Sequence, residues 1–222
     1  MVLNLINLSN RRFSKMDEVT KLHFVHETWI SEHPEDMDYL STLNIVCDVI
    51  EAKSCDPKYN RVKNLSNAYD KAIAYSGDIT LEYICELNGL VLDQKSTLRS
   101  INVKPRGYFH EYMNFNLIKD ELLKLISYIN TNREHITYLY QKFLYIHPFS
   151  NGNGRTAKLL LCSLYHPFSL YLNRDRKLYL NIISRCHLTN DQTELEVYIT
   201  ACKKQFNSIV KYSLDMLNTD KE

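Results

Sequence analysis

The residues best suited to do chemistry lie at 147–158, in the order His-Pro-Phe-Ser-Asn-Gly-Asn-Gly-Arg-Thr-Ala-Lys. Asn151, Gly152, Asn153 and Gly154 are of the two residue types that most readily adopt left-handed backbone, and a stretch with helical apolar spacing follows them. Such a turn directs several backbone N–H groups into one concavity at the positive end of a helix. The segment therefore predicts a loop that binds phosphate.

Charged and titratable side chains flank this loop. Arg155 and Lys158 are three positions apart on the first turns of the expected helix, so they project to the same side. A guanidinium pairs with two phosphate oxygens at once, whereas an ammonium acts as a point charge, so the two together suit a polyphosphate. His147 lies before the loop, and histidine titrates near neutrality, as a general base should.

Three other interpretations compete with a catalytic loop. An ordinary connection between helices would also use Asn and Gly, but it would gain nothing from the charges around 151–154. The Gly-x-Gly-x-x-Ala pattern at 152–157, with Asp175 about 20 residues later, matches a dinucleotide-binding fingerprint. That fingerprint requires a preceding strand, whereas 136–144 has helical spacing. Finally, a lone histidine such as His147 is often structural.

The elements that would position these residues are mostly helices, because apolar residues recur every three or four positions. Only 5 glycines occur, against roughly 15 at average usage, which disfavours folds with many tight turns. The segment 99–112 alternates apolar and polar residues around Pro-Arg-Gly, which is typical of a hairpin. The sequence thus predicts an all-α helical bundle with a small β-hairpin flap. The expected helices cover approximately 14–30, 36–53, 62–75, 80–92, 117–129, 133–146, 152–165, 175–186 and 191–217.

Composition excludes several classes of function. With 27 Lys and Arg against 26 Asp and Glu, the chain has no electrostatic reason to bind nucleic acid or an anionic membrane. No run of 18 apolar residues is long enough to span a bilayer. The 6 cysteines include no CxxC pair, and four lie in apolar periodic segments, so we expect free thiols in a reducing compartment. The predicted location is the cytoplasm, or a host cytoplasm into which the protein is delivered.

The segment 147–158 resembles the signature of the Fic family, usually His-x-Phe-x-Asp/Glu-Gly-Asn-Gly-Arg-x-x-Arg. This resemblance implies an all-α Fic-type bundle that transfers AMP from ATP to a Ser, Thr or Tyr hydroxyl of a target protein, with Mg²⁺. His147 would be the general base, and Phe149 would anchor the loop in the core. Gly152, Asn153 and Gly154 would hold the phosphates, and Arg155 would bind the β/γ end.

Two positions depart from the family pattern. Asn151 replaces the acidic residue that helps to hold Mg²⁺, and a neutral amide oxygen should bind the metal more weakly. Lys158 replaces the second arginine and lacks its bidentate geometry. These departures leave two alternatives open: a weak or inactive Fic-fold binding or regulatory protein, and a Fic enzyme that transfers another phosphate-containing group.

The resemblance assigns further residues. Tyr179 would lie near the adenine pocket, and Ile101, Asn102 and Val103 would form the flap that docks the target through its backbone. Glu51 resembles the glutamate of the inhibitory helix that many Fic proteins carry before the core. We hypothesise that Glu51 contacts Lys158; a solvated carboxylate at a helix end is the alternative.

The predicted organisation is an N-terminal helical extension at 1–35 and a catalytic domain at 36–222, with the inhibitory helix at 36–53. The expected partners are ATP and an unidentified target protein, and a homodimer is left open.

Overall fold

The computed structural model describes residues 15–30, 39–51, 56, 59–105, 110–165 and 176–219, and the described elements are helices. This confirms an all-helical fold for the described part of the chain. Each expected helix is present, with ends that differ by a few residues. The helices are α1 (Lys15–Ile30), α2 (Tyr39–Ile50), α3 (Asn60–Ile73), α4 (Leu81–Leu92), α5 (Ile118–Thr131), α6 (Ile136–Ile146), α7 (Asn153–Leu164), α8 (Arg176–Thr189) and α9 (Thr193–Thr219), with a short 3-10 turn, η3 (Phe115–Leu117).

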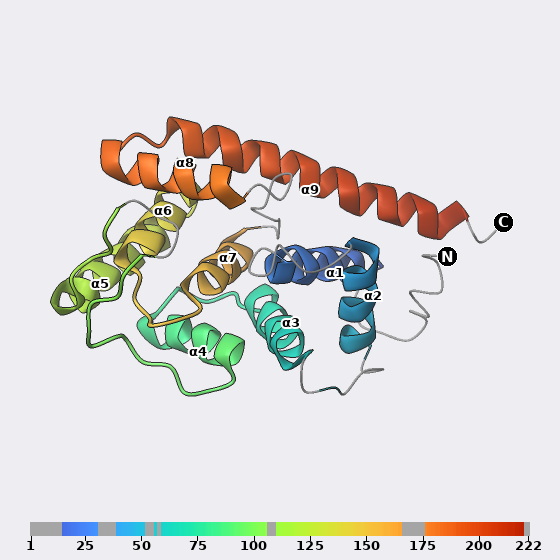
Figure 1. The fold of residues 1–222 in the computed structure, drawn as a ribbon, viewed down its shortest axis with the longest axis horizontal. Coiled ribbons are helices and arrows are strands. Elements are labelled where there is room, and N and C mark those ends of the chain that lie inside the picture. The colour runs from blue at the N-terminus through green and yellow to red at the C-terminus, as the bar shows by residue number, and fades with distance from the viewer. Residues whose placement is uncertain are drawn as a thin grey trace.

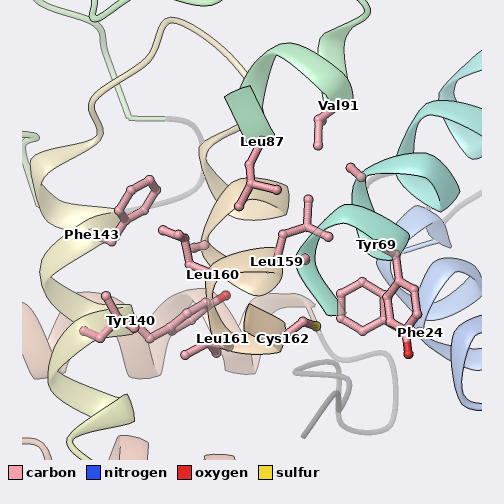
Figure 2. Close-up of a cluster of buried hydrophobic side chains, with 14 of the residues drawn as sticks. Phe24, Tyr69, Leu87, Val91, Tyr140, Phe143, Leu159, Leu160, Leu161 and Cys162 are labelled. Atoms are coloured by element: carbon pink, nitrogen blue, oxygen red, sulfur yellow. The ribbon is translucent and has the colours of Figure 1, made fainter. Parts of the chain in front are cut away.

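Helix α7 lies at the centre of the bundle, between α6 on one side and α3 and α4 on the other (Figure 1). Four consecutive apolar residues at 159–162 are buried, which a helix can accommodate only when neighbours surround it. Figure 2 shows these side chains between Tyr140 and Phe143 of α6 and the rings of Phe24 and Tyr69, which come from α1 and α3. The helix that follows the candidate loop is therefore held rigidly by the core.

The remaining helices enclose this centre. Helices α8 and α9 lie along one side of the molecule, where α8 packs on α6 and α9 packs on α1 and α6 (Figure 1). Helix α4 begins where the sequence predicts, because the Thr80 side chain accepts a hydrogen bond from the Tyr83 N–H at 3.1 Å. Helix α1 shares the core with α3 and α9. The domain boundary at residue 35 lies outside the described residues and stays a prediction.

The β-hairpin flap is a correction. No strand forms in the described residues 99–105 and 110–112, and 106–109 lie outside them. The backbone N–H of Arg99 donates to the Pro148 carbonyl at 2.9 Å, and that of Met113 donates to the Tyr145 carbonyl at 3.1 Å. The two arms of the predicted flap, residues 99–105 and 110–113, thus bond to the end of α6 and to the turn after it. These bonds replace the cross-strand pairing that the alternating pattern predicted.

Two expectations from composition agree with the described residues. Five cysteines are described, and all are free thiols: Cys47, Cys85, Cys162, Cys186 and Cys202. Cys55 lies outside the described residues. Among the described helices, none combines the length and the apolar character needed to cross a bilayer.

Candidate active site

His147 ends helix α6 in a left-handed conformation, with φ 48° and ψ 60°. Its backbone N–H donates to the Phe143 carbonyl at 3.0 Å and closes the last turn. A side chain with a Cβ adopts positive φ at an energetic cost, and such residues gather at functional sites. The conformation stops α6 at this residue and turns the chain into the loop that leads to α7.

The His147 imidazole is fixed on two sides. Its Nδ1 lies 3.3 Å from the Leu144 carbonyl, and its ring stacks on that of Tyr112 with centroids 3.7 Å apart and planes inclined by 10°. Burial is the main cause that lowers the pKa of His147 from 6.5 to about 4; the Leu144 carbonyl opposes this, and Arg99 and His110 add to it. The ring is therefore neutral at pH 7. Because a carbonyl only accepts, we assign the proton to Nδ1, which leaves the Nε2 lone pair to act as a base.

The loop between α6 and α7 is closed by the Asn153 carboxamide. Its Oδ1 accepts from the Phe149 N–H at 3.0 Å, and its Nδ2 donates to the Phe149 carbonyl at 2.7 Å. Phe149 is buried, as the predicted anchor of the loop should be. The Asn153 side chain is thus used within the loop, and its backbone N–H is one of the first-turn donors of α7.

The start of α7 is the predicted anion-binding turn. Gly152 precedes the helix with φ 77°, and a Cβ there would lie 2.8 Å from Asn88 Nδ2. Gly154 differs, because a Cβ at this position would meet nothing within 4 Å. The first intrahelical bond runs from the Thr156 N–H to the Gly152 carbonyl, so the N–H groups of residues 153–155 are the first-turn donors of the helix. Open space beside the first-turn N–H groups is what an anion at a helix N-terminus requires.

A buried asparagine of α4 holds the backbone of this turn. Asn88 Nδ2 donates to the Asn151 carbonyl and to Thr156 Oγ1, both at 3.0 Å, and Asn88 Oδ1 accepts from the Ser96 hydroxyl. Thr156 in turn donates to the Gly152 carbonyl at 3.0 Å. Helix α4 therefore fixes the backbone of the loop through one fully buried side chain.

The two predicted cations are on α7 and are 8% exposed each. Lys158 lies close enough to Cys162 to oppose the rise that burial causes in the pKa of that thiol. Two buried cations next to a helix N-terminus give the site a positive potential, which attracts a phosphorylated ligand.

Arg99 connects His147 to both arms of the predicted flap. Its buried guanidinium donates to the His147 carbonyl at 2.8 Å, to the Ile101 carbonyl at 2.7 Å and to the Met113 carbonyl. A cation at the end of α6 also satisfies carbonyls that a helix C-terminus leaves unpaired. The position of His147 therefore depends on a residue of the segment 99–112.

The structure does not build a magnesium site around Asn151. This residue is exposed, and its Oδ1 accepts from the Gly152 N–H at 2.8 Å, so the amide oxygen is engaged inside the loop. The segment 147–158 has no carboxylate, and within the described residues no group of three or more His, Cys, Asp or Glu could hold a metal. Mg²⁺ is usually bound by one or two carboxylates together with phosphates. Metal binding by Asn151 stays a prediction.

The other predicted site residues lie around this centre. Tyr179 is half-buried on α8, and its hydroxyl pairs with that of Tyr140 on α6. Ile101 is 63% exposed, and the Asn102 Oδ1 accepts from the Phe115 N–H at 3.0 Å. Glu51 follows α2, and its N–H donates to the Cys47 carbonyl at 2.9 Å. Nucleotide binding by Tyr179, target docking at 101–103 and the contact of Glu51 with Lys158 stay predictions.

Sequence reasoning missed three residues of the site. The hairpin prediction covers Arg99 and Tyr112 only as parts of the segment 99–112, and the helix prediction at 80–92 gives Asn88 no role. An arginine in a polar stretch and a polar residue within an apolar helix are weak local signals. Asn88 nevertheless lies in helical register with the apolar residues Ile84 and Val91, where a buried polar group needs partners, and that signal could have found it.

These features define an all-helical protein with a neutral histidine beside a cationic helix N-terminus. Residues 78–165 match the Fic/DOC family. The chain is 25% identical over 183 residues to the protein adenylyltransferase Fic of Nematostella vectensis, which covers 65% of this chain and 43% of that protein. The chain therefore spans less than half the length of this curated relative.

Solved structures show the same fold. Fic-1 (aa134–508) from C. elegans has a TM-score of 0.73 at 19% identity, covering 95% of this chain and 69% of that one. A Fic family protein from Desulfovibrio desulfuricans G20 has a TM-score of 0.69 at 16% identity, covering 92% of this chain and 66% of that one. Residues 78–165 thus resemble the Fic/DOC family, and the chain shares the fold of solved Fic proteins. The matched region includes α4, which carries Asn88, and α5, α6, the loop and α7.

The dinucleotide interpretation is wrong for this chain. The segment before the loop is the helix α6, whereas the dinucleotide fingerprint needs a strand there.

Proposed function

We propose that the protein is an adenylyltransferase that transfers AMP from ATP to a Ser, Thr or Tyr hydroxyl of a target protein. The observation that carries the proposal is that a neutral His147, with Nδ1 on the Leu144 carbonyl, and the N-terminus of α7 lie on one loop. A base and an anion-binding helix end on one loop suit the transfer of a phosphate-bearing group to a hydroxyl. The name of the Nematostella vectensis relative supports AMP as that group.

The reaction requires little covalent chemistry from the protein. His147 Nε2 takes the proton of the target hydroxyl, whose oxygen forms a bond to the α-phosphorus of ATP. The bond between that phosphorus and the bridging oxygen to the β-phosphorus breaks, and pyrophosphate leaves with the electron pair. The N–H groups of Asn153 and Gly154 and the cations of Arg155 and Lys158 would stabilise the negative charge on the phosphates. Residues 101–103 would dock the target segment.

Labelled ATP tests this function directly. The wild-type protein, incubated with Mg²⁺ and α-labelled ATP, should label itself or proteins of a lysate, whereas γ-labelled ATP should give no label. His147→Ala should abolish the label, and His135→Ala, which changes an exposed histidine at the start of α6, should not. The proposal fails if wild type and His147→Ala give the same signal, or if the γ-label is the one transferred.

The second candidate is a Fic-fold binding or regulatory protein without transferase activity. The engaged amide of Asn151 and the lysine at 158 favour it, because neither supplies what the family signature has at these positions. Binding of ATP without any His147-dependent label in the wild type would support this candidate.

A further inference from the structure

We propose that Tyr112 is a positioning residue of the site, whose ring fixes the plane of the His147 imidazole against the end of α6. The inference rests on the proposed role of His147 as the base. The two rings are nearly parallel, at 10°, and their centroids are 3.7 Å apart, so they are in full van der Waals contact over their faces.

The second constraint on the imidazole is weak by itself. Its Nδ1 lies 3.3 Å from the Leu144 carbonyl, which is long for a hydrogen bond of this kind. A single long bond restrains the rotation of the ring about its Cβ–Cγ bond only weakly. A flat ring packed on its face removes that rotation, because turning the imidazole would drive it into Tyr112. Together the two contacts leave one orientation.

Tyr112 is itself held in place on both sides along the chain. Met113 donates its N–H to the Tyr145 carbonyl at 3.1 Å, and its carbonyl accepts from the Arg99 guanidinium. On the other side, His110 is buried, with Nδ1 3.2 Å from the Ser184 hydroxyl, and its ring meets the edge of Tyr112. The ring that covers His147 is therefore part of a rigid segment.

The same guanidinium connects this segment to the base. Arg99 donates to the carbonyls of Ile101, Met113 and His147, so it joins both arms of the predicted flap to the residue that carries the imidazole. A target segment that docks at 101–103 would contact the arm that Arg99 holds. Tyr112 is the residue of the other arm, 110–113, that contacts the His147 ring.

The stacked ring also controls the environment of the imidazole. The groups that act on His147 are Tyr112, the Leu144 carbonyl, Arg99 and His110, and burial dominates the lowering of its pKa to about 4. Removing the ring opens one face of the imidazole to water, which should raise the pKa toward 6.5. The contact uses the ring of Tyr112 and not its hydroxyl, so phenylalanine should serve equally well.

Three variants test the proposal by two readouts. NMR titration follows the His147 ring resonance, identified by its absence in His147→Gln, in wild type, Tyr112→Phe, Tyr112→Leu and Tyr145→Leu. Tyr145 stacks on His187 at 3.8 Å and 23°, so Tyr145→Leu removes a similar pair that does not include the base. We expect Tyr112→Leu to raise the His147 pKa, and Tyr112→Phe and Tyr145→Leu to leave it unchanged.

Label transfer is the second readout. Tyr112→Leu should lower kcat roughly tenfold or more, with a KM for ATP within twofold, because a misoriented base slows the chemical step. It should also move the acid limb of the rate to higher pH, and Tyr112→Phe should match wild type. The proposal is overturned if Tyr112→Leu leaves the His147 titration and kcat within twofold of wild type, or if Tyr112→Phe is as impaired as Tyr112→Leu.

The two proposals fail in different ways. If the wild type transfers no label, the function is wrong, but the NMR titration still decides whether Tyr112 controls His147. If Tyr112→Leu does not fold, the wild type alone decides: nuclear Overhauser contacts between the two rings are expected, and their absence overturns the stack.

Discussion

Asn153 and Phe149 exchange two hydrogen bonds across the candidate loop, so one side chain provides partners for both the N–H and the C=O of Phe149, four residues earlier. The pair resembles one rung of a sheet, made by a carboxamide and a peptide unit. Both residues are buried, and α7 begins at Asn153 itself. The loop is therefore stiff before any ligand arrives.

Asn153→Ala should destabilise the protein by about 2–4 kcal/mol, because it leaves the buried N–H and C=O of Phe149 without partners. Urea unfolding of the purified variant measures this. Asn116→Ala, at an exposed asparagine, is the control and should change the free energy of unfolding by less than about 0.5 kcal/mol. Equal small effects for both variants would show that the closed pair contributes nothing to stability.

The two glycines around Asn153 should respond oppositely to alanine. Gly152→Ala should cost about 1–3 kcal/mol of stability, because positive φ is strained and the new Cβ would lie 2.8 Å from Asn88 Nδ2. Gly154→Ala should be neutral or up to about 1 kcal/mol stabilising, since it is helical and its Cβ meets nothing within 4 Å. Thermal unfolding distinguishes the two.

Gly154→Ala, although it leaves stability intact, should weaken nucleotide binding. If phosphates occupy the space beside Gly154, the stable variant Gly154→Ala should bind ATP at least tenfold more weakly by calorimetry. Unchanged ATP affinity in a fully folded Gly154→Ala would place the phosphates elsewhere.

Restoring the family residues should raise activity if the departures are what limits it. Asn151→Asp supplies the missing carboxylate, so transfer should need less Mg²⁺, and Lys158→Arg restores bidentate contact with phosphate. Label transfer over a Mg²⁺ titration, in each single variant and in the double variant, measures both effects. Activity that appears only in the double variant would favour the inactive binding or regulatory protein; no gain in any variant would mean that these positions do not limit the reaction.

Glu51→Ala should increase label transfer severalfold if this residue restrains the nucleotide through Lys158. Asp48→Ala is the matched control, because Asp48 is an exposed carboxylate of α2 one turn earlier. The measurement is initial rate at saturating ATP. A Glu51 variant with the same rate and ATP affinity as the Asp48 variant would contradict inhibition and leave Glu51 as a helix-end carboxylate.

Stability should fall as the solution is acidified through the range where histidine titrates. Burial is the first cause that lowers the pKa of His23, His110 and His147 from 6.5 to about 4 in the folded protein. Below pH 6.5 the unfolded chain then binds more protons than the folded one. The free energy of unfolding therefore falls between about pH 6.5 and pH 4, and these histidines do not change it above pH 7. Each such histidine contributes a slope of up to about 1.4 kcal/mol per pH unit.

Melting temperatures between pH 7.5 and 5 check this slope. His23→Gln should flatten it, and His135→Gln, at an exposed histidine, should leave it unchanged. Identical slopes in wild type and His23→Gln would show that His23 takes up no extra proton on unfolding.

The sequence by itself determined the helices and the loop, because both depend on residues that are close along the chain. Apolar spacing located α5 and α6, the expected start of α4 at residue 80 is where Thr80 caps the helix, and the consecutive Asn and Gly residues located the turn before α7. Each of these signals is local: a helical repeat, a cap, or a backbone conformation that few residues accept.

Only the tertiary structure decided what surrounds the base. Arg99 is 48 positions from His147, and it reaches the end of α6 because the chain folds back along that helix. Backbone contacts with the same region overturned the predicted hairpin, since the N–H groups of Arg99 and Met113 bond to the turn after α6 and to the end of α6. Alternation of apolar and polar residues could not reveal this, because it describes the segment alone. Partners that satisfy buried polar groups come from wherever the fold brings them, and that is set by packing and not by sequence spacing.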